Sequence, residues 1–174
     1  MAIFQTARLL ARPWTLDDVN AAFEIYGDPR VMKTLGTGPA PDIGAMRERL
    51  SAVLERNAPF AGRMGFWALE ASDSGTIVGS VILKPLPESE RVEVGWHLGH
   101  AHWGQGYATE AGRGAVAYGF ESLGLDTIWA IVLPTNERSL AVARRLGMRS
   151  EGLTDAYHNL TLELFSIRPG ELRP

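Results

Sequence analysis

The segment with the clearest chemical potential is a glycine-rich run in the middle of the chain, Trp103-Gly104-Gln105-Gly106-Tyr107-Ala108-Thr109-Glu110-Ala111. We expect a strand to end at Leu98 and a helix to begin near Gly106, so the run joins the two. A helix start carries backbone N–H groups without partners at the positive end of its dipole, and glycine lets an anion approach them closely. The pattern predicts a phosphate or pyrophosphate site, although a plain turn before a helix has a similar composition.

Two common phosphate-binding patterns fit this run poorly. A P-loop has lysine and then serine or threonine after its last glycine, whereas Tyr107 follows Gly106. A dinucleotide-binding turn needs an acidic residue about twenty residues later, at the end of the next strand. Asp126 has that spacing but precedes its expected strand, which argues against a nucleotide-binding protein of a different fold and leaves it as an alternative.

A third pattern fits better, because the run resembles the acyl-coenzyme A loop of the GNAT superfamily of N-acetyltransferases, Arg/Gln-x-x-Gly-x-Gly/Ala. Trp103 stands at the first position, Gly106 supplies the glycine and Ala108 the last small residue. Other segments resemble the RimJ/RimL-like branch, which acetylates protein N-termini and small amines. They are Arg8–Pro13, Glu93–Leu98 with the run itself, and Asn136-x-x-Ser139 followed by Arg145–Met148.

The resemblance implies an α/β fold with one GNAT domain over residues 1–174. Its mixed β-sheet would have six to seven strands, flanked by four helices and splayed between the two central strands. The implied function is transfer of an acetyl group from acetyl-CoA to a primary amine, either a protein N-terminus or a small molecule. The main alternative is a non-catalytic GNAT-fold protein that binds acyl-CoA as a sensor or interaction module.

The resemblance also implies which residues hold acetyl-CoA. Backbone amides from Gly104 to Thr109 would bind the pyrophosphate, and an amide near Leu98 would polarise the thioester carbonyl. Asn136 would bond the pantetheine arm, while charge and position suggest Arg138 and Arg144 for the adenosine phosphates. The expected coenzyme-binding residues are Trp96, His97, Leu98, Trp103, Gly104, Gln105, Gly106, Tyr107, Ala108, Thr109, Asn136 and Ser139.

Acetyl transfer needs one group to accept the amine proton and another to protonate the departing thiolate. Many family members carry a tyrosine seven residues after the asparagine, where this chain has Ala143. Ser139 is our candidate to replace it as a hydrogen-bond donor. Glu93 is our candidate base, with His97 as a lesser one because a neutral imidazole suits proton transfer near pH 7. The alternatives are a surface charge for Glu93 and an ordinary helix-start residue for Ser139.

The elements that position these residues follow from periodicity and turn chemistry. The expected order is β-α-α-β-β-β-α-β-α-β. Strands are predicted at 8–12, 65–70, 76–83, 91–98, 126–133 and 161–167, and helices at 15–26, 43–56, 106–122 and 138–146. The loops at 36–41 and 157–159 are candidates to border the acceptor.

Composition limits the remaining choices. The chain has 174 residues, 17 basic and 20 acidic side chains, and no cysteine. The charge of −3 argues against nucleic-acid binding through a general basic field, and the missing cysteines exclude disulfides and thiolate metal sites. No metal is expected, although His97, His100 and His102 lie close in sequence. The opening residues do not resemble a secretory signal and the longest apolar run is short, so we expect a cytoplasmic protein without a membrane partner. A homodimer is compatible with the resemblance.

Overall fold

One eight-stranded sheet runs through the computed structural model, which describes residues 2–174. The strand order is β1-β2-β3-β4-β5-β6-β8-β7, and every neighbouring pair is antiparallel except β5 and β6. The strands are β1 (Phe4–Gln5), β2 (Leu9–Pro13), β3 (Gly65–Ala71), β4 (Ile77–Pro85), β5 (Val92–Leu98), β6 (Ile128–Val132), β7 (Arg149–Tyr157) and β8 (Leu160–Ile167).

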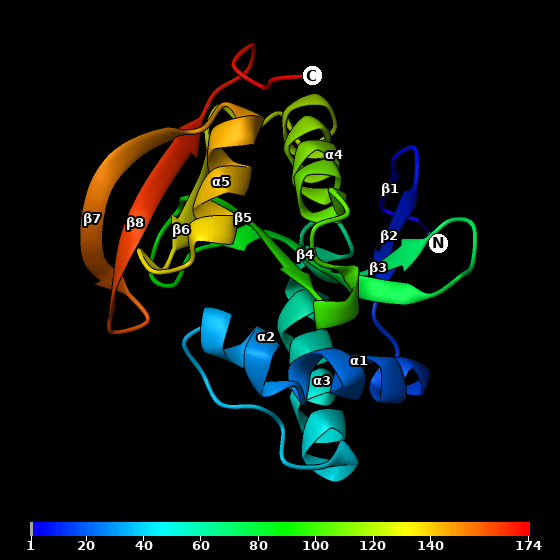
Figure 1. The fold of residues 1–174 in the computed structure, drawn as a ribbon. Helices are drawn as coiled ribbons and strands as arrows, with labels where there is room; N and C mark the ends of the chain where they lie inside the picture. The colour runs from blue at the N-terminus through cyan, green and yellow to red at the C-terminus, as the bar shows by residue number, and fades with distance from the viewer. Residues whose placement is uncertain (1) are drawn as a thin grey trace.

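Helices cover both faces of this sheet (Figure 1). On one side lie α1 (Val19–Tyr26), α2 (Pro29–Thr34) and α3 (Ile43–Asn57), and on the other α4 (Tyr107–Glu121) and α5 (Glu137–Leu146). Short 3-10 helices occupy Leu16–Asp18, Ala58–Phe60 and His100–His102. Among residues 2–174, no helix is long and apolar enough to cross a membrane.

Strand alternation separates the two larger cores, one on each face of the sheet, and a third, small cluster lies around Leu86, Tyr157, Leu162 and Leu164. The larger core packs strand residues such as Trp96 against α4 and α5, and includes Val116 and Leu146. The smaller core lies under α1–α3, with Trp14 and Leu50 among its buried residues. Each face of the central strands therefore has its own helical cover, and a ligand between strands would touch both.

The parallel strands β5 and β6 separate soon after they meet. Their pairing covers residues 92–93 opposite 128–129, and no further pair follows in the described strands. The Gly99 N–H donates to the Val78 carbonyl on β4 at 3.0 Å. Because successive strand amides alternate in direction, the Leu98 N–H points toward the gap beside β6. The predicted splay between the two central strands is thus confirmed, and it leaves backbone groups open along one edge of β5.

The predicted mixed α/β class is confirmed, with eight strands and five α-helices described where the sequence predicts six to seven and four. The pattern does not predict β1, α2 or β7. β1 has two residues and α2 six, with Asp28 capping the Arg30 N–H at 2.8 Å and Pro29 in the first turn. β7 is exposed over most of its length and its register shifts twice, so it shows no alternating pattern.

Candidate functional site

Two cavities meet where β5 and β6 separate. The first, about 1040 Å³, lies between the loop before α4, the start of α5 and the end of β5. The second, about 780 Å³, lies on the other side, under α1–α3. We call them the α4–α5 cavity and the α1–α3 cavity. The residues that line both cavities form what we call the junction. These are Thr34, Leu35, Trp96, His97, Asn136 and Ser139. Molecules bound in the two cavities would meet at this junction.

The loop before α4 forms one wall of the α4–α5 cavity. Gly104 and Gly106 adopt φ angles of +76° and +83°, which other residues rarely adopt, and Gly106 is the N-cap of α4. The first hydrogen bond of the helix runs from the Glu110 N–H to the Gly106 carbonyl, so the amides just before Glu110 have no partner within the helix. Both glycines line the cavity, as do Ala108 and Thr109.

Two residues of the predicted coenzyme loop are turned away from this wall. The Gln105 side chain donates to the Ala101 carbonyl at 3.0 Å. The Tyr107 ring lies under the Arg8 guanidinium, 4.6 Å from its centroid. Since the prediction for this loop concerns backbone amides, these two side chains support the loop without facing a ligand.

Residues near the N-terminus clamp the loop through contacts that no local sequence pattern predicts. Arg8 pairs with Glu110 at 2.6 Å and donates to the Gln105 carbonyl at 3.1 Å. Thr6 donates to the same carboxylate at 2.7 Å. Partial burial would raise the pKa of Glu110, but the hydrogen bonds from Thr6 and Arg8 outweigh it and lower that pKa. Glu110 therefore stays ionised at neutral pH and fixes the start of α4.

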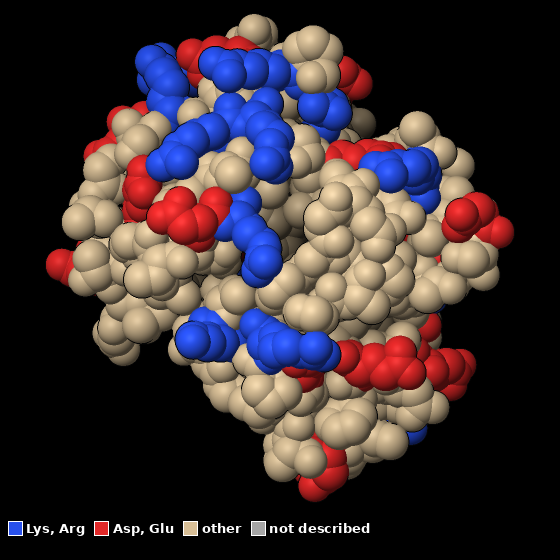
Figure 2. Space-filling view, viewed as in Figure 1, with Lys and Arg blue, Asp and Glu red and all other residues tan. Residues whose placement is uncertain are grey.

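Arginines give the α4–α5 cavity a basic wall. Figure 2 shows basic side chains gathered over α5 and along α2, around a hollow. The arginines that line the cavity are Arg8, Arg113, Arg138 and Arg145. Arg138 is on the wall as predicted, and it also lies over the Trp103 ring at 4.7 Å. The structure places Arg145 on the wall and Arg144 off it, because neighbouring residues of a helix face different directions.

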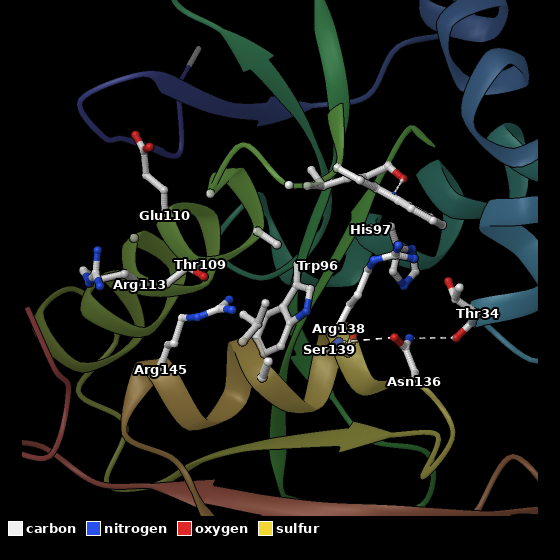
Figure 3. A pocket seen from close by; sticks show the side chains of 18 of the residues that line it. Thr34, Trp96, His97, Thr109, Glu110, Arg113, Asn136, Arg138, Ser139 and Arg145 are labelled. Carbon is white, nitrogen blue, oxygen red and sulfur yellow. Dashed lines mark hydrogen bonds between the residues drawn. The ribbon is translucent and has the colours of Figure 1, made fainter. Parts of the chain in front are cut away.

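Asn136 and Ser139 hold the start of α5 at the junction (Figure 3). The Asn136 side chain accepts from the Ser139 N–H at 3.2 Å and donates to the Thr34 carbonyl at 3.1 Å. Asn136 therefore caps α5 and ties it to α2, which leaves one side-chain hydrogen for a ligand. The Ser139 hydroxyl has no hydrogen-bond partner among residues 2–174, and it lines both cavities.

Glu93 lies at the closed end of the gap, as the last β5 residue that pairs with β6. It is buried, with 7% of its surface exposed, and its carboxylate pairs with Lys84 at 3.0 Å. Both side chains line the α1–α3 cavity. The alternative that Glu93 is a surface charge is therefore wrong, because its side chain is buried on the wall of the α1–α3 cavity. The structure keeps it as a candidate base.

His97 is a neutral imidazole in the junction. Its Nδ1 lies 3.3 Å from the Tyr26 hydroxyl, which donates to the Ser80 hydroxyl at 2.6 Å. The Phe66 ring packs against the imidazole edge, with centroids 5.5 Å apart. Burial, and secondarily the charge of Lys84, lower the pKa of His97 to about 4. His97 therefore carries no charge at neutral pH and can act as an acceptor or a donor, according to its tautomer.

Other predicted features fall at the edges of the site. Gly36 and Thr37 from the 36–41 loop and His158 from the 157–159 loop line the α1–α3 cavity. Ala143, at the position where many family members carry tyrosine, is fully buried in the larger core and lines neither cavity. In the part of the chain described, from residue 2 onward, no three His, Asp or Glu side chains gather as a metal site would require.

Comparisons with known proteins agree with this geometry. The model of the GNAT acetyltransferase domain matches residues 8–149. An uncharacterised N-acetyltransferase of Bacillus licheniformis, p20, is 28% identical over 96% of this chain and 93% of its own.

Solved structures show the same fold. An acetyltransferase from Agrobacterium tumefaciens superposes with a TM-score of 0.78 and 27% identity, over 94% of this chain and 92% of that one. RimJ of Mycobacterium smegmatis, solved in complex with CoA-disulfide, has a TM-score of 0.76 and 22% identity, over 95% and 84%. The family match covers most of the chain, including the loop before α4, the splayed strands and the start of α5. The chain therefore belongs to the GNAT family and is an acyltransferase.

Proposed function

We propose that this chain transfers the acetyl group of acetyl-CoA to the primary amine of a second molecule, with residues 1–174 acting as one domain. The observation that carries the proposal is the meeting of two cavities at the splay of β5 and β6. One cavity has the features of a coenzyme site, and the other is large enough for a small acceptor. Group transfer requires both reactants to be held side by side, which the junction permits.

The α4–α5 cavity fits the anionic part of acetyl-CoA. Amides at the start of α4 and the arginine wall suit phosphate groups, since both present N–H donors and positive charge. The Thr109 hydroxyl, on the same wall, adds a donor. The acetyl-CoA supplies an activated acyl group as a thioester.

The gap between the strands fits the pantetheine arm. Its amides could pair with the open edge of β5, where the Leu98 N–H points toward the gap. An arm that enters from the α4 loop would place its thioester near the Leu98 N–H, with Ser139 across the junction at the start of α5. Glu93 lies farther along β5, at the closed end of the gap.

Glu93 and Ser139 would divide the remaining chemistry between them. The Glu93 carboxylate, on the wall of the α1–α3 cavity beyond the junction, would accept the amine proton through water, and the Ser139 hydroxyl would donate a hydrogen bond to the departing thiolate. The amide near Leu98 would stabilise the charge that develops on the thioester oxygen. His97, held by Tyr26, would orient the amine without adding charge.

The proposal is tested by incubating the purified chain with acetyl-CoA and a panel of amines. Release of free CoA and the mass of the acetylated amine are the readouts. Thermal unfolding with acetyl-CoA, CoA and NAD tests the coenzyme site separately, because a ligand at a hundred times its Kd stabilises the fold by about 2.7 kcal/mol. Stabilisation by acetyl-CoA with no transfer to any amine would favour the non-catalytic alternative, and no stabilisation would overturn the coenzyme assignment.

A further inference from the structure

The wall of the α1–α3 cavity carries two arginines whose charge is not neutralised within the protein. Arg49 and Arg56 both line the cavity from α3. Being seven residues apart, they share one face of the helix and are separated by about 10 Å along it. The residues three and four positions away from each are apolar, so α3 offers neither of them an acidic partner. No ion pair of either arginine occurs in residues 2–174.

The other charges of the cavity do not offset these two. Arg49 donates to the carbonyls of Gly38 and Pro39 at 3.1 and 3.3 Å, and these neutral acceptors leave its charge intact. Lys84 is the third cation on the wall, and it pairs with Glu93, the acidic residue of the wall, at 3.0 Å. The cavity is therefore positive at its α3 side, which disfavours a polycationic acceptor.

The remaining wall is largely apolar, and one of its residues, Trp14, also has an unsatisfied donor behind the wall. Trp14, Met32, Met46 and Phe66 line the cavity. The Trp14 indole Nε1 is buried and has no hydrogen-bond partner among the described residues. An indole nitrogen can only donate, and a buried donor without an acceptor is costly. An oxygen-bearing anionic group would suit the arginines, and the apolar side chains would suit the body of the same ligand.

The arginines lie at a distance from the junction. Arg56 precedes Asn57, whose side chain bonds the Phe66 backbone at 2.9 and 3.0 Å. The Phe66 ring reaches the His97 imidazole, with centroids 5.5 Å apart, so Phe66 lies between α3 and the junction. Neither arginine lines the junction itself. An acceptor that extends past Phe66 would have its reacting amine at the junction and its anionic group at α3.

We propose, building on the acetyl transfer proposed above, that the acceptor is a small amine with an apolar, ring-sized body and an anionic group at its far end. Arg49 and Arg56 hold the anionic group, and the apolar wall holds the body. The cavity of about 780 Å³ is within the range of small-molecule sites. A free α-amino acid fits less well, because its amine and carboxylate are adjacent.

The test compares acceptors that differ in charge and in length. The probe is 4-(aminomethyl)benzoate, and 4-(aminomethyl)benzamide is its neutral counterpart. The other acceptors, each tested separately, are L-phenylalanine, spermidine and a peptide that begins with Ala-Asp. We expect kcat/KM for the benzoate to exceed that for the benzamide by about tenfold or more, as loss of a charged hydrogen bond predicts. Arg49→Gln and Arg56→Gln should each raise KM for the benzoate severalfold and leave the benzamide nearly unchanged.

Arg47→Gln is the matched control, since Arg47 is exposed on the same helix and does not line the cavity. Arg47→Gln should leave KM unchanged for both the benzoate and the benzamide. A preference for spermidine or the benzamide, or arginine variants that affect both acceptors equally, would overturn the inference while acetyl transfer stands. Activity with the peptide alone would replace the small acceptor by a protein N-terminus.

A direct measurement separates this inference from the proposed function. In the presence of CoA, 4-(aminomethyl)benzoate should raise the Tm of the wild-type chain more than that of the Arg56→Gln variant. Equal shifts, or none, would refute the acceptor site even if acetyl-CoA binds. Failure of acetyl-CoA itself to bind would refute the proposed function instead.

Discussion

The indole Nε1 of Trp103 donates a hydrogen bond to the carbonyl oxygen of Leu98 at 3.0 Å. This bond ties the loop before α4 to the last residue of β5, where the Leu98 N–H faces the gap. Arg138 of α5 covers the same indole ring. Trp103 therefore connects the three elements that surround the α4–α5 cavity, and it fixes the peptide group that follows Leu98, adjacent to the Leu98 N–H that we expect to polarise the thioester.

Trp103→Phe tests this connection, because phenylalanine keeps a ring under Arg138 but cannot donate to Leu98. A net hydrogen bond is worth about 1 kcal/mol, so we expect Kd for acetyl-CoA to rise about fivefold and kcat to fall. Calorimetric titration measures the first and CoA release the second. An unchanged Kd together with an unchanged kcat would show that the bond has no part in the site.

Gly106→Ala tests the backbone of the coenzyme loop. The left-handed conformation of Gly106 costs an alanine about 1–2 kcal/mol, and any relaxation moves the amides of the first turn of α4. We expect lower stability and weaker acetyl-CoA binding. Gly124 has φ of +69° and open space around its Cα, and it lies beyond α4. Gly124→Ala is therefore the control for strain alone, and equal loss of coenzyme affinity in both variants would contradict the assignment.

Ser139→Ala tests the proposed hydrogen bond to the thiolate. The variant keeps the backbone N–H of residue 139, which donates a hydrogen bond to the Asn136 side chain, so α5 should stay capped. We expect kcat to fall about 10–100-fold with little change in Kd for acetyl-CoA or in Tm. Stopped-flow detection of the CoA thiol measures the rate. A variant as fast as wild type would remove Ser139 from the chemistry.

Glu93→Gln tests the candidate base. Glutamine cannot accept the amine proton, so kcat at neutral pH should fall by about two orders of magnitude. The change also breaks the ion pair between Glu93 and Lys84. Lys84→Gln is the control, because it breaks the same ion pair but keeps the Glu93 carboxylate. Activity preserved in Lys84→Gln but lost in Glu93→Gln identifies proton transfer as the cause. Loss in both would point to structure, and loss in neither would transfer the role to His97.

The pKa of His97 predicts a pH dependence of stability. In the folded chain this pKa is about 4, against an ordinary value of 6.5, because burial and Lys84 disfavour the charged ring. Between these values the unfolded state binds more protons, so the contribution is complete above pH 6.5 and falls as the pH drops toward 4. Its size is on the order of 1–3 kcal/mol. Urea unfolding of wild type and His97→Gln between pH 4 and pH 7 checks this, and parallel curves would contradict it.

The loop before α4 could be predicted from sequence because its signals are local. Two glycines precede a helix, and both adopt the positive φ that favours glycine. The pairing of Lys84 with Glu93 could not be predicted in the same way, since it depends on the register of β4 against β5. The clamp of Arg8 on Glu110 joins residues 102 positions apart, which no local pattern reports.

Segments without a periodic pattern are the second group of elements that could not be predicted from the sequence. α2 is a single short helix whose N-cap Asp28 and first residue Pro29 come directly after Gly27, the C-cap of α1. β7 has an exposed leucine, Leu153, at 67% exposure, and few buried residues to mark a face. These elements are specified by their tertiary neighbours, β8 for β7 and the Asn136 cap for α2.

The short pairing of β5 with β6 has a consequence for the lifetime of the protein. Only two residue pairs join β5 to β6 in the described strands, so few hydrogen bonds connect the two halves of the sheet. The packing of α4 on α5 adds to this connection. An acetyl-CoA molecule that hydrogen-bonds to the edges of both β5 and β6 would add hydrogen bonds between the two halves of the sheet. Hydrogen exchange at the amides of β6 would then slow. The supply of acetyl-CoA would then govern how long each molecule resists unfolding and proteolysis, in addition to how fast it works.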